Sequence, residues 1–233
     1  MADARRELLE LLESTSPIVL TDGQAELLVA FSLLLAAAPL NVTATHGAAA
    51  IVERHVIDAL RGLEAVDRAP PGALADVGSG GGSPGLVLGI VRPERELHLI
   101  ESVGRKAAFL RGVAAELGVE ARVHAHRSEL LAAGPLRDAV ACVTARALAP
   151  PPVAIELCAP LVQPGGRLVL WSRTPPGAAI LAAAQALACS LVGSDGPQLV
   201  FEKRERTPAR FPRRPGMAAK RPLARQLAGE TTT

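Results

Sequence analysis

Aromatic side chains are scarce in this chain: its 233 residues include one Trp, four Phe and no Tyr. A hydrophobic core with so few rings must be filled by aliphatic side chains, chiefly those of Ala, Leu and Val. With 49% hydrophobic residues the chain is apolar enough to bury a sizeable core, and its length suits one domain with appendages. Extensive disorder is therefore not expected.

Cysteine is equally sparse, and its spacing excludes two kinds of site. Cys142, Cys158 and Cys189 lie far apart and form no C-x-x-C motif, so neither a zinc site nor a disulfide framework is predicted. No other metal site is predicted. Cys142 and Cys158 stand in apolar segments, where buried thiols are expected. This pattern is typical of a protein of the reducing cytoplasm.

The chain also lacks a hydrophobic run long enough to cross a bilayer. The apolar stretch 27–40 is too short for this and ends beside Pro39. Residues 1–13 are rich in charge and predict an amphipathic helix rather than a signal peptide. A cytoplasmic protein without a membrane partner is the expectation.

The small net charge hides an asymmetry. Residues 203–225 contain nine basic residues and one acid, Glu205, and so carry +8. Because the whole chain carries +2, the rest carries −6. A basic tail on an acidic body predicts a polyanionic partner. Charge alone leaves a solubilising tail as the alternative.

The chain changes character near residue 65. Before it, a capping box of Thr21 and Gln24 precedes an apolar helix over 25–38, and apolar residues spaced by 3.6 predict a helix over 48–63. After it, short apolar strands alternate with helices, which predicts a doubly wound, mostly parallel α/β sheet. We expect a helical cap (1–65), a Rossmann-like core (66–205) and a basic, partly extended tail (206–233). The first strand ends at Val77; further strands are expected at 96–100, 121–125, 139–144 and 167–171, helices at 105–117, 153–161 and 178–188, and a closing hairpin at 191–193 and 198–204.

The most informative segment follows the first strand. There an apolar run ends in Asp76 and meets the glycine-rich turn 78–85, in which Pro84 suits the first turn of a helix. Glycines allow positive φ and let a ligand lie directly on the backbone. In an open α/β sheet, ligands bind at the carboxyl ends of the strands. The segment therefore predicts an adenosine-containing cofactor.

Two cofactor classes use such a turn. Residues 80–85 match G-x-G-x-x-G, the dinucleotide fingerprint, although a segment this rich in glycine matches it easily. The frame Asp76-x-Gly78-x-Gly80 fits S-adenosylmethionine better, because the carboxylate of Asp76 can serve the cationic methionine end of that molecule. A nicotinamide-dependent oxidoreductase remains the alternative.

Two further segments would complete an adenosine site. Glu101 ends the second strand, where an acid accepts hydrogen bonds from the two ribose hydroxyls in either cofactor class. His126, Arg127, Ser128 and Glu129 follow the third strand, at a place that often flanks an adenine. A solvated charge at Glu101 and surface histidines are the plainer interpretations.

Arg146 closes the fourth strand and is our candidate catalytic residue. At that place its guanidinium can clamp a substrate phosphate or a cofactor carboxylate, or it can form a salt bridge to a neighbouring helix. Arg54 and Asp58 are spaced i,i+4 and can pair with each other, and His55 flanks the apolar stripe of their helix.

Taken together, these residues resemble the RsmG (GidB) family of bacterial methyltransferases that act on 16S ribosomal RNA. The resemblance covers nearly the whole chain, and the order and spacing of its motifs are more specific than any one of them. The motifs are Asn41-Val42-Thr43, Arg54-His55-x-x-Asp58, the turn from Asp76 to Gly85, Glu101-Ser102-x-Gly104-Arg105-Lys106, Thr144-Ala145-Arg146-Ala147, and the basic tail from Arg206 through Phe211-Pro212-Arg213-Arg214-Pro215-Gly216 to Lys220-Arg221-Pro222-Leu223.

The resemblance implies a class I fold and transfer of a methyl group from S-adenosylmethionine to N7 of a guanine in 16S ribosomal RNA, presented alone or in the 30S subunit. It assigns cofactor contacts to Gly78, Ser83, Glu101, Ser128, Glu129 and Arg146, beside Asp76 and Gly80. We also expect a monomer. The RNA-binding candidates are Arg54, His55, Lys106, Arg173, Arg210, Arg213, Arg214, Lys220 and Arg221.

Two departures from the family pattern concern the pocket. Ser83 stands where the family usually has Phe, and Ser172-Arg173 stands where Lys-Gly is usual. The change to Ser83 removes an apolar wall of the cofactor pocket. Arg173 keeps the positive charge, but its guanidinium has a different geometry from an ammonium group. A non-catalytic RNA-binding protein on the same fold is therefore a second alternative.

Overall fold

The computed structural model describes residues 2–38, 42–194 and 198–223. Asn41 of the first family motif and the end of the tail from residue 224 lie outside the described residues. In the described part of the chain no helix is both long and apolar enough to cross a membrane. The same residues contain no cluster of three or more His, Cys, Asp or Glu side chains that could hold a metal ion.

The described strands form one sheet of seven in the order β3-β2-β1-β4-β5-β7-β6. Strands β3, β2, β1, β4 and β5 run parallel to one another, and β7 runs antiparallel to both β5 and β6. The doubly wound, mostly parallel sheet predicted from the sequence is thus confirmed. The strands are β1 (Leu74–Val77), β2 (Leu97–Ile100), β3 (Ala121–His124), β4 (Val140–Arg146), β5 (Val162–Trp171), β6 (Cys189–Gly193) and β7 (Gln198–Lys203).

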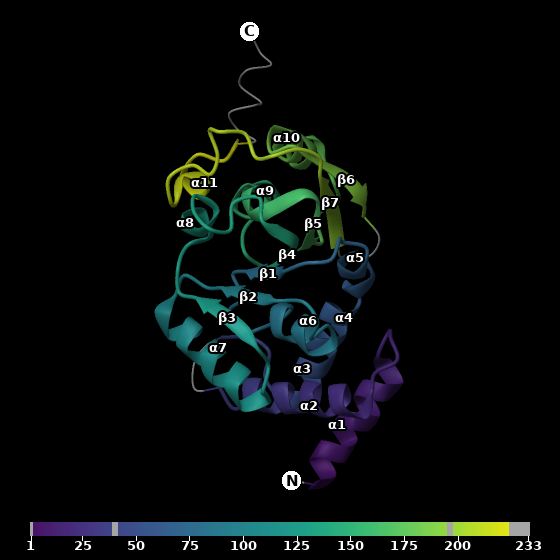
Figure 1. Ribbon diagram of the computed structural model, residues 1–233. Helices are drawn as coiled ribbons and strands as arrows, with labels where there is room; N and C mark the ends of the chain where they lie inside the picture. Colours follow the sequence, from purple (N-terminus) through teal and green to yellow (C-terminus); the bar gives the residue numbers. More distant parts are fainter. Residues whose placement is uncertain (1, 39–41, 195–197, 224–233) are drawn as a thin grey trace.

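Helices cover both faces of the sheet and bury two hydrophobic cores (Figure 1). The strands alternate between the cores as period-2 side chains require: Leu74 faces the first core and Ala75 the second. On the first face lie α1 (Ala2–Thr15), α2 (Asp22–Ala36), α3 (Ala48–Ile51), α4 (Asp58–Leu60), α5 (Leu63–Asp67), α6 (Gly85–Val91) and α7 (Gly104–Leu117); on the second lie α8 (Ser128–Ala132), α9 (Pro151–Cys158), α10 (Ala178–Ala186) and α11 (Met217–Lys220).

The N-terminal helices start where the sequence predicts but do not all continue as predicted. The capping box is present: Thr21 accepts from the Gln24 N–H, and the Gln24 side chain accepts from the Thr21 N–H. The helix predicted over 48–63 is present over 48–60, although it is not α-helical throughout. A π-helical segment, η1 (Val52–Ile57), lies between α3 and α4, and the chain turns at Gly62 before α5.

Most of the remaining differences from the predicted elements lie at their ends. Strand β5 begins at Val162 rather than at 167, with a register break against β4 between Val140 and Cys142. Helix α9 starts at Pro151 and passes at Cys158 into a short 3-10 turn, η2 (Ala159–Leu161), and the short helix α8 was not predicted. These differences do not alter the doubly wound, mostly parallel arrangement of the sheet.

The chain after β7 packs against the second core. Phe211 and Leu223 are buried there. The Arg137 guanidinium donates to the carbonyl of Phe211 at 2.6 Å and to that of Thr207 at 3.0 Å. The buried Lys203 ammonium donates to Thr207 Oγ1 at 2.8 Å. Residues 206–223 are therefore held against the sheet by apolar burial and by hydrogen bonds.

Candidate functional site

Two hollows meet at Gly78, beyond the carboxyl end of β1. The larger, about 280 Å³, is lined by the turn 78–83, residues 42–44, His55, Lys106 and Arg146. The smaller, about 60 Å³, is lined by Gly78, Ser102 and residues 126–129. Gly78 has φ +75°, and a Cβ there would come within 2.7 Å of Leu148 Cδ1. A glycine at 78 thus keeps the backbone open between the two hollows.

Glu101 lies beside the two hollows: it stands between Ile100 and Ser102, which line the smaller one, and it binds Gly80, which lines the larger one. Its Oε2 accepts the N–H of Gly80 at 3.0 Å, and its Oε1 accepts the N–H of Val103 at 2.8 Å. These bonds fix the carboxylate, which is 6% exposed. Each carboxylate oxygen has a second lone pair. The side chain can therefore accept one more hydrogen bond at each oxygen, as the two hydroxyls of a ribose require.

Asp76 lies behind the glycine turn rather than over the hollow. Its Oδ1 accepts from the Thr144 hydroxyl at 2.9 Å, and its Oδ2 accepts the N–H of Gly85 at 3.3 Å. Burial raises the pKa of Asp76 to about 6, against the hydrogen bonds from Thr144, Ser79 and Gly85 and the charge of Arg146, which lower it. In this arrangement Asp76 ties the start of α6 to β4.

Ser128 and Glu129 begin α8 and line the smaller hollow, where the sequence predicts the adenine. Both are buried. Glu129 Oε1 also accepts the N–H of Gly216 at 2.9 Å. A predicted cofactor residue is therefore in direct contact with the C-terminal segment.

Arg146 ends β4 and points into the larger hollow. Its Nη1 donates to the Asp58 carboxylate at 3.0 Å and to the Arg54 carbonyl at 2.8 Å, and its Nη2 donates to His55 Nδ1. Asp58, which the spacing predicts as a partner of Arg54, instead pairs with Arg146. The salt bridge weighed for Arg146 is thus present, and the guanidinium still lines the hollow.

Ser83 is 9% exposed, and its hydroxyl donates to the His55 carbonyl at 2.8 Å. The Ser83–Pro84 peptide bond is cis. The family's apolar residue is replaced here by a hydrogen bond that joins the glycine turn to η1.

Comparisons with known proteins decide between the cofactor classes. A family model described as rRNA small subunit methyltransferase G matches residues 24–189. A protein named ribosomal RNA small subunit methyltransferase G from Rubrobacter xylanophilus is 37% identical over 229 residues, 86% of this chain and 84% of the relative. One from Moorella thermoacetica is 30% identical over 94% of this chain and 98% of the relative. The chain belongs to the rRNA small subunit methyltransferase G family.

Family membership confirms the resemblance read from the motifs. It identifies the chain as a methyltransferase that uses S-adenosylmethionine. The alternative interpretation of the glycine turn, a nicotinamide-dependent oxidoreductase, is thereby excluded. Among solved structures, a mutant form of MtNAS has a TM-score of 0.51 at 15% identity, over 77% of this chain and 70% of that one. At that identity the likeness shows the shared fold alone.

In this family member, the predicted RNA-binding residues are spread over three places. His55 and Lys106 line the larger hollow, with Arg54 exposed beside them. Arg173 is exposed directly after β5. In the C-terminal segment Arg210, Arg214, Lys220 and Arg221 are exposed, whereas the Arg213 guanidinium pairs with Glu156, at 2.6 Å between Nη2 and Oε2, and donates to the Arg221 carbonyl.

Several residues that form hydrogen bonds in or behind the site escaped prediction from the sequence. Thr43 stands in a family motif, but nothing in its spacing indicated its bond to His55, and Thr45 carried no signal. Ser79 stands within the glycine-rich turn, and nothing in the sequence indicated a separate role for it. Its hydroxyl donates to the Asp76 carbonyl at 2.9 Å. Thr144 precedes Arg146 by two residues, and period-2 alternation places both on one face of β4. That alternation is the signal that could have identified Thr144.

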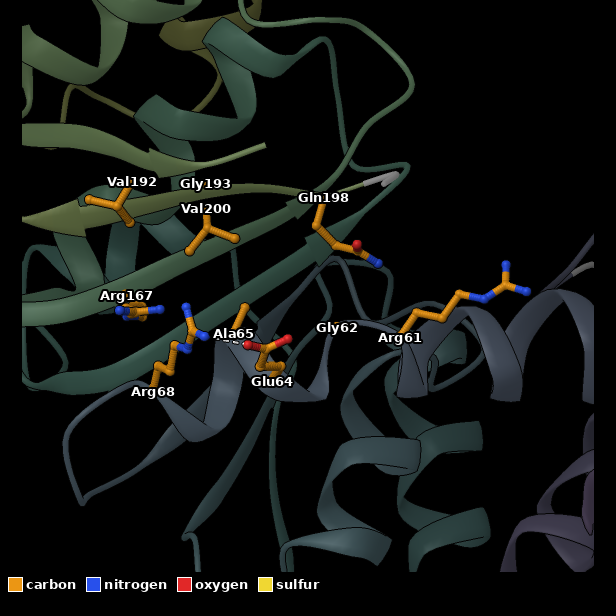
Figure 2. A pocket seen from close by; sticks show the side chains of 10 residues that line it. All are labelled: Arg61, Gly62, Glu64, Ala65, Arg68, Arg167, Val192, Gly193, Gln198 and Val200. Carbon is orange, nitrogen blue, oxygen red and sulfur yellow. Dashed lines mark hydrogen bonds and ion pairs between the residues drawn. The ribbon is translucent and has the colours of Figure 1, made fainter. Parts of the chain in front are cut away.

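A separate hollow lies between α5 and strands β5, β7 and β6 (Figure 2). Figure 2 shows Arg68 and Arg167 near one end and Gln198 toward the other, with Arg61 extending away. Glu64 pairs with Arg68. The lining thus mixes both signs of charge, and its residues differ from those predicted for the cofactor.

Proposed function

We propose that this enzyme transfers a methyl group from S-adenosylmethionine to N7 of a guanine in small-subunit ribosomal RNA. One observation carries the proposal within the family: two hollows meet at Gly78, the carboxylate of Glu101 is fixed on the backbone beside them, and the cationic side chains of Lys106 and Arg146 line the larger hollow. An adenine beside the smaller hollow, with its ribose at Glu101, leaves the larger hollow for the methionine end and the incoming base.

The residues present fit this cofactor. Glu101 keeps one lone pair on each oxygen for the ribose hydroxyls, and Ser128 and Glu129 flank the space for the adenine. The bare backbone at Gly78 allows the cofactor to lie against the chain. When bound, S-adenosylmethionine supplies an electrophilic methyl group on a sulfonium.

The reaction at guanine N7 requires little acid–base catalysis by the protein. N7 carries an in-plane lone pair and no proton, so attack on a methyl carbon requires no general base. The contribution of the protein is alignment and the exclusion of water, and positioning of this kind can be worth about 7–11 kcal/mol. Such a role suits a pocket whose side chains are held by hydrogen bonds.

Arginines and lysines near the larger hollow would hold the RNA. Arg146 and Lys106 line it, and Arg54 is exposed beside it. Arg173, Arg210, Arg214, Lys220 and Arg221 extend the basic surface, with the helical segment 1–65 covering the sheet face from which His55 reaches the hollow. An RNA substrate of the ribosome implies that the enzyme acts in the cytoplasm, and we propose that it acts there as a monomer.

The test is transfer of tritiated methyl groups from S-adenosylmethionine to naked 16S RNA and to 30S subunits. N7-methylguanine is identified by borohydride reduction and aniline cleavage of the RNA at the modified nucleotide. We expect incorporation at one guanine. Incorporation at another atom would contradict the N7 assignment, and RNA binding without incorporation would support the non-catalytic alternative.

Glu101→Gln tests the cofactor site in the same assay. The amide keeps the size of the side chain but replaces one acceptor oxygen with a donor that faces an N–H. Since a hydrogen bond to a charged group contributes about 1.5–3 kcal/mol, S-adenosylmethionine should bind at least about tenfold more weakly. Calorimetry measures the affinity, and an unchanged dissociation constant with an unchanged melting temperature would remove Glu101 from the site.

A further inference from the structure

The side chain and backbone of His55 contact three walls of the larger hollow. Its Nδ1 accepts from the Arg146 guanidinium at the end of β4. Its Nε2 lies 2.9 Å from Thr43 Oγ1 and 3.1 Å from Thr45 Oγ1, in the segment that precedes α3. Its carbonyl accepts the Ser83 hydroxyl from the glycine turn at 2.8 Å. One residue thus joins the strand end, the 43–45 segment and the glycine turn.

The π-helical segment η1 explains how one residue makes all these contacts. Single π-helical turns inside helices often occur at functional sites, because the wider turn alters the direction of its carbonyl and side-chain groups. In η1 two consecutive carbonyls accept hydrogen bonds from outside the helix: that of Arg54 from Arg146, and that of His55 from Ser83.

The hydrogen bonds also assign the protonation state of the ring. A guanidinium has donors and no acceptor, so the Nδ1 that faces Arg146 must carry a lone pair. The proton of a neutral ring then lies on Nε2, which donates to the threonine hydroxyls. Burial, followed by the charges of Arg146 and Arg54, lowers the pKa of His55 to about 4, in agreement with a neutral imidazole.

We propose that His55 is a positioning residue, which orients Arg146 toward the substrate side of the larger hollow through its Nδ1 lone pair. This inference rests on the proposed function of the pocket and goes beyond it, since the sequence assigns His55 to RNA contact. Both ring nitrogens are occupied within the protein, and the guanidinium it holds is the group that meets the RNA. Asp58 holds the other guanidinium nitrogen at 3.0 Å.

Two substitutions of His55 distinguish the roles of its two ring nitrogens. In His55→Asn, the amide oxygen can take the place of Nδ1 and keep the acceptor for Arg146. In His55→Gln, the longer side chain places its amide near the Nε2 position and keeps a partner for Thr43 and Thr45. We expect kcat within about threefold of the native value for Asn and a loss of more than tenfold for Gln, with the affinity for S-adenosylmethionine unchanged in both. His46→Gln, an exposed change in the neighbouring segment, is the matched control.

A double-mutant cycle with Arg146→Gln distinguishes positioning from RNA contact. If His55 acts through Arg146, adding His55→Gln to Arg146→Gln lowers kcat no further. Multiplying losses, or equal losses in the Asn and Gln variants, would overturn the proposal. Melting temperatures of the variants show whether a lower kcat reflects damage to the fold.

Nitrogen-15 NMR of the native protein gives a result that does not depend on activity. We expect a neutral His55 ring with its proton on Nε2 near neutral pH, and a changed Nδ1 shift in Arg146→Gln. A proton on Nδ1, or a charged ring, would overturn the inference even if methyl transfer is confirmed. A native enzyme that methylates no RNA would instead overturn the proposed function, and the NMR result would still test the contact of His55 with Arg146.

Discussion

At the scale of single residues, the pKa shifts of Asp76 and His55 make the free energy of unfolding change with pH in opposite directions. Asp76 has its pKa raised from 3.8 to about 6 by burial, so the folded protein binds its proton more tightly than the unfolded chain does. Over that interval the folded state holds more protons, and the free energy of unfolding must fall as the pH rises. At higher pH, the buried carboxylate is a net cost of about 3 kcal/mol.

Asp76→Asn should remove this dependence. The asparagine oxygen can accept from the Gly85 N–H, and its amide group can donate to Thr144 Oγ1, whose hydroxyl lies 3.4 Å from the Ala75 carbonyl. We expect the free energy of unfolding of the variant to increase relative to that of the native protein as the pH rises from about 4 to about 6. Urea unfolding at several pH values measures this. A constant difference between the two proteins across that range would contradict the raised pKa of Asp76.

His55 contributes the opposite slope and so provides a control. Its pKa in the folded protein, about 4, lies below the ordinary value of 6.5, so between these values the unfolded chain holds the extra proton. Stability from His55 therefore rises with pH until about 6.5 and is lost as the pH falls through about 4. The lowered pKa values of His98 and His124, caused first by burial, act in the same direction. In Asp76→Asn these histidine slopes should become visible.

At the scale of elements, much of the fold follows from local sequence, whereas the contacts between elements do not. The capping box of Thr21 and the alternation of short strands with helices depend on near neighbours in the chain, and both are predicted. The pairing of Asp58 with Arg146 joins residues that lie 88 positions apart, whereas spacing alone favoured Arg54 as the partner of Asp58. Long-range packing thus overrode the local preference.

Gly62, which lines the separate hollow beside α5, shows how tightly the neighbouring elements are packed. It lies between α4 and α5, and a Cβ there would come within 2.3 Å of Trp171 Cζ2. The Trp171 ring is held in place, since its Nε1 donates to the Asp58 carbonyl at 2.9 Å. We expect Gly62→Ala to destabilise the protein by about 1–3 kcal/mol, the usual cost of overpacking.

Gly112→Ala is the matched control for Gly62→Ala. Gly112 lies within α7 and is exposed, and a Cβ added there would meet no atom of the described residues within 4 Å outside its own helix backbone. The same substitution there should stabilise the protein by about 0.5–1 kcal/mol, because alanine favours a helix interior. Denaturant unfolding compares the two, and similar effects at both positions would contradict the packing argument.

At the scale of the whole molecule, the sequence predicts the asymmetry of charge but not how the basic segment is anchored. Its charge is visible in composition, whereas the burial of Phe211 and Leu223 in the second core requires knowledge of what α8 and α9 leave uncovered. Arg213 was predicted as an RNA contact, and the structure places it on the buried Glu156. A run of charges gives no sign of which member pairs within the protein.

The anchoring decides how the basic segment should be tested. Deleting residues 206–233 would expose part of the second core as well as remove charge, so weaker RNA binding would have two causes. Replacing the exposed Arg214, Lys220 and Arg221 with Gln removes charge alone. If these side chains contact phosphates, the dependence of log K on log salt should become shallower by about 2–3, since each contact contributes about 0.7–0.9.

A triple variant with the same change in net charge separates local contact from the general field of the protein. Arg6, Arg68 and Arg122 are also exposed, on α1, after α5 and on β3, away from the C-terminal segment. Their replacement with Gln should change the salt dependence of 16S RNA binding by less than about 1, because charges that touch no phosphate release no counterions. Filter binding or fluorescence anisotropy over a series of salt concentrations gives both slopes. Equal slopes in the two triple variants would show that the C-terminal arginines and lysine act through net charge and do not contact the RNA.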